Sequence, residues 1–137
     1  MQGYLFLAIY NFYVIIVLMK WAAEYYRDAV GKEPVAEFIN SLPERTRART
    51  FRLVKLLKDY GVLLNEPYTK QVRGKTRELR IKDNQGAIRI LYFTYTGRRF
   101  ILLHGFIKKT DKTPIRDIEI AEKRMNDFLQ RQGGDNL

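Results

Sequence analysis

Three consecutive segments in the second half of the chain carry the apolar pattern of β-strands. In RELRIKD, residues 77–83, apolar residues occupy every second position, as in a strand with one buried face. The runs AIRILYFTY, 87–95, and FILLHGFIKK, 100–109, are more apolar and follow the turn residues NQG and TGRR. Short turns between successive strands are typical of a meander. We therefore predict three antiparallel strands.

Apolar residues at helical spacing predict two helices before these strands. The segment 34–42 begins with Pro34, which suits the first turn of a helix. The next helix is expected to start at a capping box formed by Ser41 and Glu44 and to end near Tyr60. Gly61 follows it, and a glycine can adopt the left-handed conformation that terminates a helix.

The remaining segments complete the predicted order of elements. Residues 20–28 are predicted as a strand, and 61–76 as a loop that contains at most one short strand. Thr113 and Pro114 are typical of a helix start, and a last helix is predicted to follow them. The order strand-helix-helix-strand-strand-strand-helix predicts an α+β fold. We expect its helices to pack on one face of an antiparallel sheet.

The first 18 residues differ from the rest of the chain. Residues 3–19 contain no charged side chain, and their length is at the lower limit of about 17 apolar residues for a membrane-spanning helix. They lack the basic start and cleavage motif of a signal peptide. Three interpretations remain open: an extension upstream of a natural start at Met19, a genuine membrane- or partner-binding segment, or a structured strand. The predicted organisation is an extension 1–18, a domain 19–132 and a flexible tail 133–137.

Positive charge is concentrated in the middle of the chain. The net charge is +10, and residues 45–109 contain seventeen Lys and Arg against four Asp and Glu. Such a field attracts polyanions. Nucleic acid is the leading candidate, and an anionic membrane surface or an acidic protein is the alternative.

Residue types exclude several classes of chemistry. The chain has no cysteine, which excludes disulfides, zinc–thiolate sites and cysteine nucleophiles and fits a reducing compartment. One histidine and scattered acids do not have the spacing of metal ligands. We therefore expect neither a metal ion nor another cofactor.

Four polar residues on the predicted strands are candidates for catalysis. Glu78 and Arg80 share one face of their strand. Arg89 lies within an apolar strand, where an arginine is costly unless it is paired or wet. His104, the only histidine, ends an apolar run. Antiparallel pairing would bring all four into one patch, although a structural bridge between Glu78 and Arg89 and a structural role for His104 are the alternatives.

This set of residues has the chemistry that metal-free RNA cleavage requires. A carboxylate or imidazole can accept the proton of the ribose 2′-OH, and guanidinium groups bind phosphate and stabilise the developing charge. The substrate supplies the nucleophile. Further candidates for phosphate binding are the nearby cations Arg73, Lys75, Arg77, Lys108 and Lys109.

Several motifs together resemble a known family. VRGKTRELRI at 72–81, IRILYF at 88–93, LLHGFIKKTDKTP at 102–114 and EIAEKRMNDF at 119–128 occur in the order found in the HigB-type, phage-derived branch of the RelE/ParE toxin superfamily. The resemblance covers residues 20 to 131. It departs from some RelE relatives in one respect, because no tyrosine follows Tyr95.

The resemblance implies a cytoplasmic toxin of a type II toxin–antitoxin system with a RelE-like fold. Such a toxin cuts mRNA in the A site of the 30S ribosomal subunit and is neutralised by an antitoxin, here a helix-turn-helix protein. Arg89 matches the family's phosphate-binding arginine, and Glu78 and Arg80 match polar positions on the preceding strand. Lys108 and Lys109 match basic positions, and His104 is typical of the branch. ParE-type toxins of the same fold poison gyrase without cutting RNA, so a non-catalytic inhibitor is the alternative.

Overall fold

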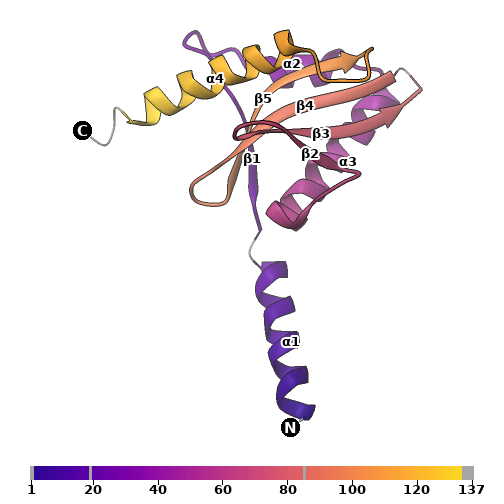
Figure 1. Ribbon diagram of the computed structural model, residues 1–137, viewed down its shortest axis with the longest axis vertical. Coiled ribbons are helices and arrows are strands. Elements are labelled where there is room, and N and C mark those ends of the chain that lie inside the picture. The colour runs from indigo at the N-terminus through magenta and orange to yellow at the C-terminus, as the bar shows by residue number, and fades with distance from the viewer. Residues whose placement is uncertain (1, 19, 85, 134–137) are drawn as a thin grey trace.

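The computed structural model describes residues 2–18, 20–84 and 86–133. Within this part of the chain, the strands form one sheet and the helices lie around it (Figure 1). In order, the elements are α1 (Gln2–Leu18), β1 (Ala22–Tyr25), α2 (Pro34–Ser41), α3 (Glu44–Tyr60), the short 3₁₀ helix η1 (Gly61–Leu63), β2 (Thr69–Arg73), β3 (Thr76–Asp83), β4 (Gly86–Tyr95), β5 (Arg99–Lys108) and α4 (Ile115–Gly133).

The five strands form a single sheet in the order β1-β5-β4-β3-β2. The pairs β2–β3, β3–β4 and β4–β5 are antiparallel, which confirms the predicted meander. The first strand differs, because β1 pairs with β5 in parallel, Ala22 opposite Arg99. The α+β fold class is confirmed, and the architecture is consistent with a RelE-like fold. The predicted order of elements omitted β2 and α1.

Strand β2 occupies part of the segment that was expected to be mainly loop. It pairs with β3 from Thr69 opposite Leu79 to Arg73 opposite Thr76, with a register shift between Gln71 and Arg73. A shift of this kind interrupts the alternation of side chains. The strand is also only five residues long, so its pattern in the sequence is weak.

Helices cover both faces of the sheet, and the expectation that all of them pack on one face is wrong. Helices α2 and α3 pack through Val35, Ile39 and Leu57 on one apolar cluster of the sheet. Helix α4 packs through Ala121 and its neighbours on a second apolar cluster, on the opposite face. Figure 1 shows α4 and α3 on different sides of the strands.

The apolar residues on both faces of strand β4 explain why helices cover both faces of the sheet. Ile88, Ile90 and Tyr92 belong to the cluster beneath α2 and α3, whereas Leu91 and Phe93 belong to the cluster beneath α4. A strand that is apolar on both faces has to be covered on both. The nearly continuous apolar run 88–93 was therefore the sequence feature that indicated a helix on each side.

A bulge between β4 and β5 decides which way His104 points. Leu91 pairs with His104 and Tyr92 with Leu102, so Leu103 has no partner in the ladder. Strict alternation would place His104 with Leu102, beneath α2 and α3. Because of the bulge, His104 lies with Leu91 on the α4 face, and the residues after it follow this new phase.

The boundaries of α3 agree with prediction, but its N-terminal cap does not. The helix begins at Glu44 after Pro43, and no side chain in the described part of the protein caps it. The Ser41 hydroxyl donates instead to the Phe38 carbonyl oxygen at 2.6 Å, because α2 continues to Ser41. The predicted capping box is therefore wrong.

Gly61 ends α3, as predicted, and the position requires glycine for two reasons. Its φ is +59°, and its N–H donates to the Leu57 carbonyl oxygen. A Cβ at this position would lie 2.1 Å from Nε1 of Trp21, so the indole packs directly on the glycine backbone. This contact joins the end of α3 to the start of β1.

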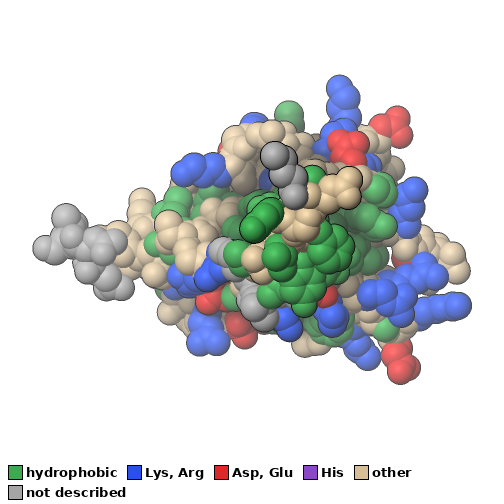
Figure 2. Space-filling model, turned by 90° about the horizontal axis from the view of Figure 1, so that it is seen from below, with side chains coloured by type: hydrophobic (Ala, Val, Ile, Leu, Met, Phe, Trp, Pro, Cys, Tyr) green, Lys and Arg blue, Asp and Glu red, His purple; other side chains and the backbone are tan. Residues whose placement is uncertain are grey.

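Helix α1 leads away from the rest of the molecule (Figure 1). The interpretation of this segment as a strand is thus wrong. Most aromatic and aliphatic side chains described on this helix, within residues 2–15, are exposed, among them Tyr4, Phe6 and Phe12. Figure 2, which looks from the free end of α1, shows apolar side chains at the centre and Lys and Arg around them. Among the helices within the described residues, none combines the length and apolarity needed to span a membrane.

Candidate functional site

Glu78, Arg80 and Arg89 form one ionic cluster on the α4 face of the sheet. Arg80 lies opposite Arg89 in the β3–β4 ladder, and Glu78 precedes Arg80 on the same face. Oε1 of Glu78 is 3.6 Å from Nε of Arg80 and 3.8 Å from Nε of Arg89. The structure therefore brings together three of the four residues that were predicted to be catalytic.

Arg89 is the least satisfied member of the cluster. The residue is only 5% exposed, and its Nε has no hydrogen-bond partner among the described residues. Nη1 donates to the Ile88 carbonyl oxygen at 3.1 Å. Burial lowers the pKa of Arg89, an effect that Glu78 opposes and Arg80 reinforces. A buried guanidinium with an unused donor is costly to folding.

Glu78 receives a further contact from the segment before α4. The Thr113 hydroxyl, predicted as a helix cap, donates to Oε2 of Glu78 at 2.6 Å. One carboxylate oxygen thus faces the two arginines, and the other is held by Thr113. This arrangement fixes the orientation of a buried carboxylate next to two cations.

A cavity of about 340 Å³ opens above Glu78, and we call it the Glu78 cavity. Lysines from three segments contribute to its lining: Lys70 from β2, Lys108 from β5 and Lys112 from the loop before α4. The pKa of Lys108 is lowered, first by burial and then by Arg89. The cavity places the carboxylates of Glu78 and Asp111, the guanidinium group of Arg80 and the Lys108 ammonium group, whose pKa is lowered, around one space, with Arg89 behind Glu78. A substrate phosphate would fit this chemistry.

His104 lies on the same face but outside the ionic cluster. It pairs with Leu91, which in turn pairs with Glu78. The histidine is therefore two strand spacings, about 10 Å, from Glu78. The expected single patch is interrupted by Leu91.

The imidazole of His104 is engaged on both nitrogens. Nε2 lies 2.7 Å from Oδ1 of Asp117, and Nδ1 lies 3.3 Å from Nη1 of Arg124. The ring also stacks on Phe106. Burial lowers the pKa of His104, Asp117 partly opposes this effect, and Arg124 reinforces it. These contacts fit a neutral imidazole that donates to Asp117, accepts from Arg124 and joins β5 to α4.

The other predicted phosphate-binding cations are dispersed. Arg73 pairs with Glu122 of α4. Arg77 points to the opposite face, where it donates to the Thr69 hydroxyl at 3.1 Å. Lys75 lies in the exposed turn between β2 and β3, and Lys109 is exposed just after β5. Of this set, only Lys108 lines the Glu78 cavity.

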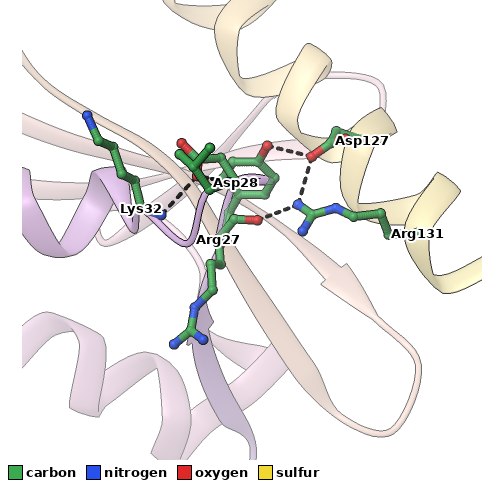
Figure 3. Close-up of polar contacts among 7 residues, drawn as sticks. Arg27, Asp28, Lys32, Asp127 and Arg131 are labelled. Carbon is green, nitrogen blue, oxygen red and sulfur yellow. Dashed lines mark hydrogen bonds and ion pairs between the residues drawn. The ribbon is translucent and has the colours of Figure 1, made fainter.

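Helix α4 is held over this face by polar contacts at its far end. The Tyr26 hydroxyl donates to Oδ2 of Asp127 at 2.6 Å, and Arg131 donates to the same oxygen at 2.7 Å. Arg131 also donates to the carbonyl oxygen of Arg27. Figure 3 shows Asp127 and Arg131 pointing from α4 toward the segment after β1. These contacts, with those of His104 and Thr113, keep α4 beside the ionic cluster.

Lys70, Lys112 and Thr113 were not predicted as site residues. Lys70 was missed because β2 was read mainly as a loop. Thr113 was interpreted only as a cap, and its distance of 35 residues from Glu78 hides the contact in the sequence. The cationic Lys70 and the apolar Val72 have the parity of a single strand face, so alternation gave no clear signal for Lys70.

The fold and the ionic cluster together define a class of small basic α+β proteins with a RelE-like arrangement of strands and helices. Residues 37–126 match the family model described as phage-derived protein Gp49-like (DUF891), and the chain therefore belongs to this family, a family of toxin–antitoxin toxins. No curated protein matches the chain in sequence.

Proposed function

We propose that the protein is the HigB-type toxin of a type II toxin–antitoxin pair and cuts mRNA on the ribosome without a metal ion. The observation that carries this proposal is the buried Glu78–Arg80–Arg89 cluster beside a lysine-lined cavity. Buried ion pairs contribute little to the free energy of unfolding. The Arg89 Nε, which lacks a hydrogen-bond partner among the described residues, reduces this free energy. Buried ionic groups that reduce the stability of the fold are often functional.

The roles follow from the contacts of each group. Glu78 accepts the proton of the ribose 2′-OH, whose oxygen then attacks the adjacent phosphorus. The guanidinium groups of Arg80 and Arg89 stabilise the charge on the pentavalent phosphorane. Lys108 gives a proton to the departing 5′-oxygen, and its lowered pKa makes its ammonium group a stronger acid. The P–O5′ bond breaks, which leaves a 2′,3′-cyclic phosphate and a 5′-hydroxyl.

The biological setting of this reaction is part of the proposal. The target is mRNA in the A site of the 30S subunit, in the cytoplasm, and the neutralising partner is a helix-turn-helix antitoxin. Membership of a toxin–antitoxin family and the basic charge of the chain support this setting. Co-expression of an adjacent open reading frame for such a partner is expected to relieve growth arrest.

The activity is tested by adding variants to a translating extract and mapping mRNA ends by primer extension. Arg89→Met keeps much of the buried side-chain volume but removes the guanidinium group, and we expect cleavage to fall by about 100-fold or more. Glu78→Gln keeps an acceptor for Thr113 but removes the base, with a loss of about 100-fold or more. Circular dichroism checks that both variants are folded.

A matched control is Arg45→Met, because Arg45 is an exposed residue of α3 that does not line the Glu78 cavity. It loses the same charge and is expected to cleave mRNA as the unmodified protein does. Full cleavage by folded Arg89→Met would contradict the assigned role. Intact mRNA together with inhibited supercoiling by gyrase would instead establish the non-catalytic alternative.

A further inference from the structure

A second cavity lies on the other side of Arg80, where the edge of β3 faces α3. Its volume is about 460 Å³, and we call it the β3-edge cleft. Helix α3 contributes Arg49, Arg52 and Leu53, and β3 contributes Arg80, Ile81 and Lys82. Pro67, Tyr68 and Arg89 complete the lining.

The cleft exists because β2 covers only part of β3. Along β3, the last backbone hydrogen bond to the β2 segment runs from the Arg80 N–H to the carbonyl oxygen of Tyr68, at 2.8 Å. Beyond Arg80, the edge of β3 is open to α3, and Nη1 of Arg49 donates to the Lys82 carbonyl oxygen at 3.3 Å. The open edge and the arginine helix thus form the two walls.

The charge of the cleft is strongly one-sided. Five of its lining residues are Lys or Arg, and none of the described residues that line it is acidic. Asp83 pairs with Arg49, and Glu78 pairs with Arg80 and Arg89, so these two carboxylates offset part of the charge. Arg52 and Lys82 have no ion-pair partner within the described residues, and both are exposed.

A second observation is an accessible aromatic ring beside these cations. Arg89 is among the lining residues, but its Nε lies 3.8 Å from Oε1 of Glu78 and so belongs to the ionic cluster on the α4 face. Tyr68, at the mouth, is 44% exposed, so its ring is accessible. Cations that follow a groove, together with an accessible aromatic ring, are characteristic of single-stranded nucleic-acid binding.

We propose that the β3-edge cleft binds a single-stranded stretch of RNA that continues from the Glu78 cavity. Its backbone phosphates contact Arg52 and Lys82, and one base stacks on Tyr68. Arg80 lines both cavities and is the point at which the strand passes from one to the other. The choice of RNA rests on the proposed function, whereas the presence of the site does not.

The test measures binding rather than cleavage, so the two proposals fail separately. The probe is a fluorescent single-stranded 12-mer with 2′-O-methyl riboses, which cannot be cut, and Kd is measured by anisotropy at several salt concentrations. Arg52→Ala/Lys82→Ala is expected to weaken binding at least 10-fold. It should also lower the slope of log K against log salt by about 1.4, since each phosphate contact on a single strand contributes about 0.7.

The matched control is Arg45→Ala/Lys58→Ala, which removes two exposed cations from the same helix but outside the cleft. It is expected to bind within 2-fold of the unmodified protein. Tyr68→Ala should weaken binding about 5-fold or more without changing the salt slope, because stacking contributes about 1–3 kcal/mol per base. Tyr68→Phe should bind normally.

Two results would overturn the proposal. One is a loss of affinity in Arg52→Ala/Lys82→Ala no larger than in the control. The other is equal competition for the cleft by double-stranded RNA or by polyglutamate, which would mean a site for duplexes or for an acidic protein. Cleft-dependent binding in a protein that does not cleave mRNA would leave this site intact and refute only the nuclease.

Discussion

At the scale of the residue, Arg89 and His104 are two buried polar side chains that differ in their hydrogen bonding. Arg89 is buried with an unused donor, and its nearest carboxylate oxygen is 3.8 Å away. His104 is also largely buried, yet both of its nitrogens have partners. The first residue therefore keeps a hydrogen-bond donor for the substrate that we propose, and the second is committed to contacts within the fold.

The lowered pKa of His104 predicts a pH dependence of stability. Because burial lowers its pKa below the usual 6.5, the unfolded chain takes up a proton before the folded protein does. Stability is therefore expected to fall as pH decreases through about 6.5. His104→Gln should flatten this change between pH 7 and pH 5, as measured by urea denaturation at each pH. An equally steep loss in the variant would show that other groups are responsible.

At the scale of the element, α4 decides the shape of the candidate site. Its start lies beside Glu78 through Thr113, its middle holds His104 through Asp117, and its end is fixed by Asp127 and Arg131. The apolar contacts of the helix with Phe93 and Leu103 give little directional information. The polar contacts at three points along its length define its position.

Removal of one of these contacts should loosen the far end of α4. Tyr26→Phe deletes the hydroxyl that donates to Asp127, and we expect a loss of about 1 kcal/mol in the free energy of unfolding. Faster hydrogen exchange should be confined to the last turns of α4. Tyr60→Phe is the control, because Tyr60 is exposed and its hydroxyl makes no side-chain hydrogen bond within the described residues. Unchanged exchange in Tyr26→Phe would show that apolar packing alone holds this end.

At the scale of the whole molecule, a basic domain carries a separate apolar helix. Most apolar side chains described on α1, within residues 2–15, are exposed, unlike those of α2 and α3, which reach the core. An exposed apolar surface of this kind promotes association. The folding of the domain, by contrast, depends on the two clusters that cover the sheet.

Deletion of residues 1–18 should therefore leave the domain folded. We expect the free energy of unfolding to change by less than about 0.5 kcal/mol, as for surface changes outside the core. Sedimentation should show less self-association than in the full chain. A large loss of stability would mean that α1 packs on the domain in solution.

Much of the fold was encoded in local patterns. The limits of α3, the three strands of the meander and the glycine at the end of α3 follow from neighbouring residues, because periodicity and turn chemistry act over a few positions. The parallel pairing of β1 with β5 was not accessible in this way, since the two strands are separated by more than 70 residues. The position of α4, on the face of the sheet opposite α2 and α3, was missed because it also depends on contacts between distant segments.

For the candidate site, the sequence by itself determined which groups are present: one carboxylate and two arginines on adjoining strands, within a strongly basic segment. The tertiary structure alone decided how they are arranged. The bulge at Leu103 set the face of His104, the end of β2 opened the β3-edge cleft, and Thr113 reached Glu78 across 35 residues. Residue type and periodicity are local properties, whereas burial, pairing and cavities depend on contacts between distant segments.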